Sequence, residues 1–358
     1  MKAIIAIDSF KGCLTSLEAG LAAKEALLEC HPGADVAAIP VSDGGDGMLD
    51  AFTCAMNGTK TIVNVHDPLM RRIEAQYGIT PGGTAIVEVA QACGLTLLKP
   101  DELNPMAATT YGVGELIAHA VRSGCRNFIV GLGGSATSDA GIGMLKALVD
   151  ILAKGKTIDD VVAGPMEGCR FTLASDVRNP LLGPEGAARV FAPQKGATPE
   201  VVETIENRAK RFARMSAVHF GYDRSCTPGA GAAGGLGYAF MQYFGAESVP
   251  GADLLFDKIG FDGLLGGANL VITGEGHADG QTLMGKLPQR ILCRASKKGV
   301  PTWLIAGRVD DSAELLEAGF RKVECINPAG LRLADALKPE VAKANIKKTI
   351  MSMIKQAQ

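Results

Sequence analysis

Six short segments of the chain combine glycines with carboxylates, lysines or small hydroxyls, and a seventh is a glycine-rich run of bare backbone. Exposed backbone N–H groups and lysines bind phosphate oxygens, while carboxylates bind Mg²⁺ or accept the proton of a hydroxyl group. This combination of groups predicts phosphoryl transfer. The segments are DSFKG (8–12), DGGDG (43–47), GLGGSATSDAG (131–141), SDVRNPLLGPEG (175–186), FAPQKGA (191–197), PGAGAAGGLG (228–237) and ITGEGHADGQT (272–282).

Two glycine patterns suggest a dinucleotide-dependent dehydrogenase as the alternative. Gly131, Gly133 and Ala136 have the spacing G-x-G-x-x-A, but the acidic residue expected about 20 positions later falls inside an expected helix. A second match begins at Gly229 and follows Pro228 rather than a strand. Hydride transfer also needs a proton donor, yet four of the five histidines lie outside the seven segments, where surface or packing roles are expected. The exception is His277.

Composition excludes several classes of protein. A net charge of −2 over 358 residues provides no basic surface for nucleic acid or anionic lipid, so neither is expected as a partner. No apolar run is long enough for a membrane span or a signal peptide. Nine cysteines without a C-x-x-C pair predict small, buried, reduced thiols in a cytoplasmic protein, with neither disulfides nor a zinc site.

Strands and helices alternate at both ends of the chain, which predicts an α/β fold with a parallel sheet. Apolar strands are expected at 3–7, 35–41, 269–274, 301–307 and 322–327, and a capping box of Thr15 and Glu18 opens a helix through 17–30. Between them, strands at 61–67, 72–80 and 84–90 are separated by turn residues and predict hairpins or a meander. We therefore expect residues 1–62 and 268–358 to form one domain, with residues 63–267 inserted as a second.

The seven segments, in this order, resemble the bacterial glycerate kinases, from Ala3 to about Gly307. The resemblance implies a Rossmann-like three-layer domain with a parallel sheet, a second α/β domain inserted into it, and an active site in the cleft between the domains. It implies transfer of the γ-phosphate of ATP, with Mg²⁺, to D-glycerate, and production of 2-phosphoglycerate. A glycerate 3-kinase and a catalytically inactive sugar-acid-binding homologue remain alternatives, and a homo-oligomer stays open.

The resemblance also implies roles for particular residues. It makes residues 133–137 a phosphate loop at a helix N-terminus, and Asp8, Asp176 and Asp279 the candidates for a general base. Asp139 and Glu275 are expected near the metal. The catalytic set is Asp8, Lys11, Asp176, Asp279 and Lys286. The binding set is Asp43, Gly44, Gly45, Gly133, Gly134, Ser135, Thr137, Asn179, Lys195, Gly274, Glu275 and Gln281.

The sequence departs from the family pattern in a few places. His277 stands where arginine usually follows the GEG loop, and Arg308 stands where a small residue is usual. We hypothesise that Arg308 restores the positive charge that His277 does not permanently carry. The stretch 148–170 is shorter than usual, which is expected to change the rim of the pocket or a subunit contact.

Overall fold

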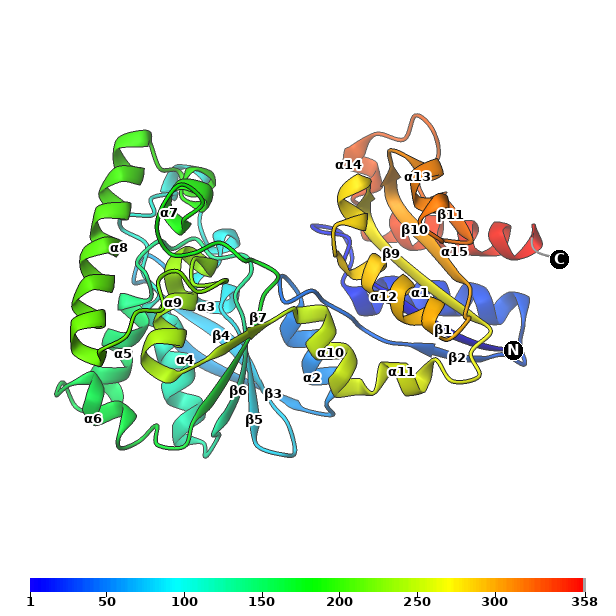
Figure 1. Ribbon diagram of the computed structural model, residues 1–358. Helices are drawn as coiled ribbons and strands as arrows, with labels where there is room; N and C mark the ends of the chain where they lie inside the picture. Colours follow the sequence, from blue (N-terminus) through cyan, green and yellow to red (C-terminus); the bar gives the residue numbers. More distant parts are fainter. Residues whose placement is uncertain (357–358) are drawn as a thin grey trace. The chain divides into compact units, whose positions relative to one another are not determined.

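The α/β class is confirmed by the computed structural model, which describes residues 1–356 (Figure 1). Residue contacts divide the chain into two compact units. The first comprises Met1–Asp43, Asp50–Met56 and Ala252–Gln358, and the second comprises Gly44–Leu49 and Asn57–Gly251. These contact boundaries differ from the expected 62/63 and 267/268, and the Gly-rich segment 44–49 makes its contacts within the second unit. None of the described helices combines the length and apolarity required to span a membrane.

The first unit contains a five-stranded sheet in which every neighbouring pair is parallel. Side chains alternate across it: Ile5 and Ile305 belong to a core with α1 and α15, whereas Leu304 belongs to a core with α12 and α13. Helices therefore cover both faces (Figure 1). In spatial order the strands are β11 (Lys322–Cys325), β10 (Thr302–Val309), β9 (Leu270–Ala278), β1 (Lys2–Ile7) and β2 (Asp35–Ala38).

Helices of the first unit begin at recognisable signals. The predicted capping box of Thr15 and Glu18 opens α1, and the Asp311 carboxylate accepts the N–H groups of Ala313 and Glu314 at the start of α13. The helices within the first unit are α1 (Ser16–Cys30), α11 (Phe261–Leu264), α12 (Leu287–Lys297), α13 (Ser312–Glu317), α14 (Leu333–Ala336) and α15 (Pro339–Lys355). Two further helices, α2 (Met48–Ala55) and α10 (Gly251–Ile259), begin in residues of the second unit and continue into the first.

The second unit contains a six-stranded mixed sheet. The predicted meander is confirmed, because β3, β4 and β5 pair antiparallel, while β5 through β8 pair parallel. Val87, Val130 and Leu173 occupy equivalent places on neighbouring strands and share one core with the helices. In order the strands are β3 (Thr59–His66), β4 (Arg72–Ile79), β5 (Thr84–Glu88), β6 (Asn127–Gly131), β7 (Arg170–Ala174) and β8 (Glu247–Val249).

Long helices pack against this second sheet, and short ones lie in the connections. The core contains Leu116 of α4, Met144 of α5 and Phe240 of α9 beside the strand residues. The helices are α3 (Ala90–Cys93), α4 (Tyr111–Arg122), α5 (Ile142–Leu152), α6 (Ile158–Val162), α7 (Ala187–Phe191), α8 (Pro199–Phe220) and α9 (Ala232–Phe244).

The expectation of buried thiols is wrong for several cysteines. All nine are free, in agreement with the absence of disulfides, and Cys93 and Cys125 are buried. Cys54, Cys226, Cys293 and Cys325 are exposed, because the sequence alone does not show which face of an element a small residue occupies.

Candidate functional site

A group of carboxylates and lysines lies at the carboxyl edge of the first sheet. Asp8 directly follows β1, and its N–H donates to the carbonyl of Gly274 on β9. The neighbouring residue Glu275 lines the same pocket as Asp8, together with Asp43, Lys11 and Lys286. The pocket has a volume of about 430 Å³. The first unit thus collects five of the predicted site residues around one cavity.

Asp8 has the most perturbed acidity in this pocket. Burial of the carboxyl group, together with the nearby negative charges of Asp43 and Glu275, raises the pKa of Asp8 to about 7, against the lowering effect of the hydrogen bond from the Ser9 N–H. Burial also raises the pKa of Glu275. A carboxylate with a pKa near neutrality can both exist unprotonated and accept a proton effectively. Asp8 is therefore suited to general-base chemistry.

Glu275 lies on a strand rather than in the loop that the sequence suggested. Strand β9 continues to Ala278 because β10 pairs with it beyond the glycines, with Arg308 opposite His277. One carboxylate oxygen of Glu275 accepts a hydrogen bond of 2.6 Å from the Thr282 hydroxyl. The other lies 3.7 Å from Nζ of Lys286.

Asp279 and Gln281 follow this strand. Asp279 caps the short helix Gly280–Leu283, where its carboxylate accepts the N–H of Gln281, and it lies 3.8 Å from Nζ of Lys286. These contacts make Asp279 a weaker general-base candidate than Asp8. The Gln281 side chain is exposed.

Arg308 and His277 share a single carboxylate. Nε2 of His277 lies 2.8 Å from one oxygen of Asp310, and Nε of Arg308 donates to the other at 2.7 Å. Both side chains line the pocket, and Arg308 brings a positive charge beside His277. Asp310 offsets part of that charge. The hypothesis that Arg308 compensates for His277 stays a prediction.

The glycines of the DGGDG segment pack tightly against other backbone in the second unit. A Cβ on Gly133 would lie 2.5 Å from the Cα of Gly45, and a Cβ on Gly44 would lie 2.6 Å from the carbonyl oxygen of Ala174. Only glycine permits this approach at the carboxyl ends of β6 and β7. The substrate-binding roles predicted for Gly44, Gly45, Gly133 and Gly134 stay predictions, since close backbone packing by itself explains glycine at positions 44 and 133.

The expected phosphate loop does not lie at a helix N-terminus, so this prediction is wrong. Helix α5 begins at Ile142, several residues after Thr137. The carboxylate of Asp139 accepts the N–H groups of Gly141 and Gly143 at 3.0 Å, and that of Thr110 at 2.8 Å. The donors at the start of the helix are therefore bonded to Asp139. The same late helix start breaks the dinucleotide fingerprint, whose third small residue should open the helix.

The Asp139 carboxylate links two helix starts by hydrogen bonds and is poorly placed to bind a metal. Besides the three backbone N–H groups, its carboxylate accepts the Thr110 hydroxyl at 2.9 Å. Thr110 in turn accepts the N–H of Met144, so the pair joins the start of α4 to the start of α5. Its predicted metal role stays a prediction, and these hydrogen bonds count against it.

Lys195 is a buried cation beside the predicted phosphate loop. Its side chain is 2% exposed, and its ammonium donates to the Thr137 carbonyl at 2.6 Å and to the Ser135 hydroxyl at 3.2 Å. Burial lowers the pKa of Lys195 to about 8. The hydroxyls of Thr137 and Ser138 are buried nearby without a hydrogen-bond partner. The structure thus brings Lys195, Ser135 and Thr137 together, as the resemblance implies.

The PGAGAAGGLG segment leads into α9 through left-handed backbone. Ala233, Gly234 and Gly235 have positive, non-helical φ angles that interrupt the first turn of α9, and the Gly234 carbonyl accepts the N–H of Ala140. Ala140 also has a positive φ, which is uncommon for alanine. Strained backbone of this kind is concentrated at functional sites. The segment therefore supports the 137–140 region from the opposite side.

Asp176 and Asn179 lie in the connection that follows β7. The Asn179 amide donates to the Glu185 carbonyl at 2.8 Å, while the Asn179 carbonyl accepts the N–H of Gly231. Asn179 therefore links two of the Gly-rich segments. Asp176 is exposed.

Sequence reasoning missed Glu88. It ends β5, is buried, and its carboxylate accepts the Leu49 N–H at 2.9 Å at the start of α2. It lies in register with Gly131 at the carboxyl end of β6. The signal for Glu88 in the sequence is weak, because the residue falls inside the strand expected at 84–90 rather than after it.

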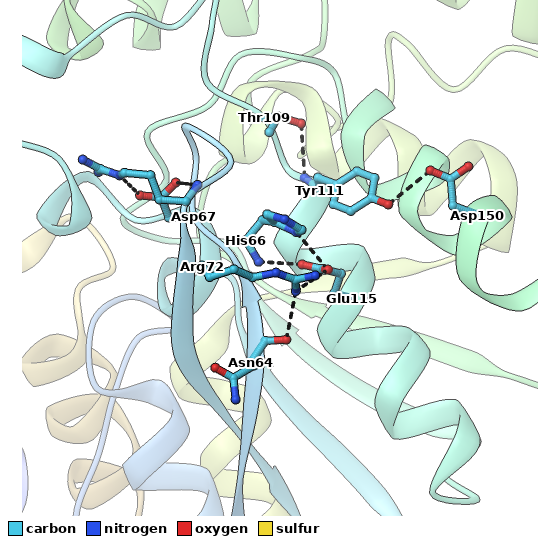
Figure 2. A network of polar contacts seen from close by, with 9 residues as sticks. Asn64, His66, Asp67, Arg72, Thr109, Tyr111, Glu115 and Asp150 are labelled. Carbon is cyan, nitrogen blue, oxygen red and sulfur yellow. Dashed lines mark hydrogen bonds and ion pairs between the residues drawn. The ribbon is translucent and has the colours of Figure 1, made fainter.

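His66 and His119 have packing roles, as expected. Figure 2 shows His66 against Glu115, which also pairs with Arg72, and Tyr111 donating to Asp150. Nδ1 of His119 lies 3.0 Å from the Tyr77 hydroxyl. Throughout residues 1–356, no cluster of three His, Cys, Asp or Glu side chains is arranged to hold a metal ion.

Several known proteins are similar to this chain in sequence and in fold. A family model described as the glycerate kinase family matches residues 3–358. A glycerate kinase of Bacillus subtilis is 38% identical, covering 94% of this chain and 93% of its own. A glycerate 2-kinase of Escherichia coli is 37% identical, covering 87% of this chain and 86% of its own. A crystal structure from Salmonella typhimurium, described as glycerate kinase 2, is 34% identical with a TM-score of 0.85, and covers 100% of this chain and 98% of its own. The chain belongs to the glycerate kinase family.

Proposed function

We propose that this chain is an ATP-dependent kinase that phosphorylates the 2-hydroxyl group of D-glycerate, with Mg²⁺. Family membership supports the class of enzyme, and the similarity to the glycerate 2-kinase of Escherichia coli supports the 2-position. The observation that carries the proposal is the pocket of the first unit, where a carboxylate with a pKa near 7 shares one cavity with two lysines.

In this proposal Asp8 orients the acceptor hydroxyl and accepts its proton. The pKa of about 7 makes the carboxylate a better proton acceptor than an ordinary aspartate, and the unprotonated form is still available at neutral pH. In phosphoryl transfer the transition state is loose, so positioning and charge neutralisation contribute more than the base itself. Lys11 and Lys286 supply positive charge from the walls of the same pocket.

The residues present fit a Mg²⁺ ion that is bound mainly through phosphate oxygens. Protein sites of this kind usually supply one or two carboxylates rather than a complete cage. Glu275 and Asp43 line the pocket and would hold the ion. Only one carboxylate oxygen of Glu275 accepts the hydrogen bond from Thr282. When bound, Mg²⁺ neutralises charge on the phosphates.

Phosphorus NMR tests this function directly. Incubation of the protein with ATP, MgCl₂ and D-glycerate should produce the signals of ADP and 2-phosphoglycerate, and omission of any component should abolish both. A 3-phosphoglycerate signal instead would overturn the proposed position. Absence of turnover with D-glycerate and related hydroxy acids would overturn the kinase and favour the inactive sugar-acid-binding homologue.

A further inference from the structure

The pocket of the first unit has an apolar half that the proposed phosphoryl chemistry does not use. Its apolar lining consists mainly of Phe10, Ile326, Leu333 and Leu337, and three of these four residues lie in the last fifth of the chain. Phe10 and Ile326 are buried. Leu333 is 73% exposed and Leu337 is 41% exposed, so two large apolar side chains form the rim of the pocket in contact with water. The same cavity therefore offers an apolar surface and a charged one.

The size of the pocket exceeds what the acceptor needs. A volume of about 430 Å³ falls in the range of sites for drug-sized ligands and cofactors, roughly 300–1,000 Å³. A three-carbon acid would fill a small part of it and has no group for the apolar half. A nucleotide has both parts: an aromatic base that benefits from apolar contact, and phosphates that need positive charge.

The position of the pocket in the sheet agrees with a nucleotide. The strand order β11-β10-β9-β1-β2 reverses direction between β1 and β9, and Asp8 and Glu275 mark the carboxyl ends of these two strands. In open parallel sheets, ligands bind in the crevice outside the carboxyl ends where the order reverses. The charged half of the pocket, with Lys11 and Lys286, lies at that point.

We propose that the apolar half of this pocket holds the adenine base of ATP, and that the phosphates extend toward Lys11 and Lys286. This assignment rests on the proposed function for the identity of the nucleotide. Leu333 and Leu337 then act as base-binding residues at the rim, where the base covers apolar surface that water otherwise contacts.

The test replaces the two rim leucines by a polar residue of similar size. The double variant Leu333→Gln/Leu337→Gln should weaken ADP binding, measured by calorimetry without turnover, about tenfold through loss of apolar contact. Binding of inorganic tripolyphosphate, which lacks the base, and the KM for D-glycerate should stay within about twofold of wild type. The matched control is Leu21→Gln/Leu316→Gln, because both leucines are exposed on helices of the same unit and neither lines the pocket.

Each remaining outcome has a definite meaning. Equal ADP affinity in the rim variant and the control overturns the inference. A raised KM for D-glycerate with unchanged ADP binding also overturns it and assigns the pocket to the acid. The wild type could bind ADP more tightly than the rim variant and yet transfer no phosphate to glycerate. In that case the proposed function fails, while the adenine site is supported. Thermal melting of all variants, expected to match wild type, excludes misfolding as the cause.

Discussion

At the scale of single residues, Asp8 is the principal candidate for acid–base chemistry in the first unit. Its acidity results from burial and from two neighbouring carboxylates, while Lys11 opposes the shift only weakly. The pKa is therefore a property of the folded pocket rather than of the DSFKG segment. Two measurable consequences follow, one for activity and one for stability.

The pH profile of the enzyme should carry the titration of Asp8. We expect kcat/KM to rise with pH to a midpoint near 7 and then level off, because only the unprotonated carboxylate accepts a proton. Asp8→Asn should lower kcat by about 10²–10⁴-fold and abolish this limb. Asp35 is an exposed residue at the start of β2. Asp35→Asn is therefore the control and should change neither kcat nor the pH profile. A limb that survives in Asp8→Asn would assign the base to another group.

The same substitution should affect stability with the opposite sign. Between about pH 4 and 7 the folded protein holds a proton on Asp8 that the unfolded chain has released, so the free energy of unfolding falls as pH rises through this range. Asp8→Asn removes this pH-dependent loss of stability, because asparagine does not titrate. Urea unfolding should show the variant gaining stability relative to wild type at pH 8 but little at pH 4.

At the scale of elements, Asp139 shows how a residue in a phosphate-like motif can serve the architecture. Its carboxylate collects hydrogen bonds from the starts of two helices, α4 and α5, and from the turn between Asp139 and Ile142. Ala140, which has a positive φ, donates its N–H to the carbonyl of Gly234, next to Ala233, which also has a positive φ. The segment 131–141 is thus positioned by elements far apart in the sequence.

Asp139→Asn should therefore destabilise the fold. An amide can accept fewer of the converging N–H donors, and an unsatisfied buried donor costs about 1–3 kcal/mol. Thermal melting should show a lowered Tm. Asp150→Asn on helix α5, which affects only one contact to the Tyr111 hydroxyl, should melt like wild type. A variant that keeps the wild-type Tm but loses turnover and requires far more Mg²⁺ would instead support the metal role.

At the scale of the whole molecule, the predicted site residues divide between two units with separate cores. Asp8, Lys11, Asp43, Glu275 and Lys286 line one pocket of the first unit, whereas Ser135, Thr137 and Lys195 form a hydrogen-bonded group in the second. The chain crosses between the units next to Asp43 and Gly44. Ligand binding to one unit can therefore be distinguished from binding to the other.

Hydrogen exchange with ADP alone should report which unit holds the nucleotide. We expect slower exchange in peptides covering 8–13 and 326–337, since binding suppresses local opening there. Peptides covering 133–141 should exchange at the unliganded rate. Protection of 133–141 with no change at 326–337 would place the nucleotide in the second unit and contradict the adenine site.

The sequence by itself determined the class of fold, the alternation of elements and the chemical inventory. These depend on local patterns: apolar runs of strand length, the Thr15 and Glu18 box, and glycines beside carboxylates and lysines. Capping of α1 and the antiparallel meander followed from such patterns. The seven motifs also identified the family, because their order along the chain is itself a property of the sequence.

Only the tertiary structure decided which of these groups share a site and what each contributes. Burial and through-space charge raised the pKa of Asp8, and backbone N–H donors at the starts of α4 and α5 gave the Asp139 carboxylate a structural role. Leu333 and Leu337 carry no motif and joined the pocket through the return of the chain after β11. Such relations depend on distances between residues remote in sequence, which local propensity and spacing do not encode.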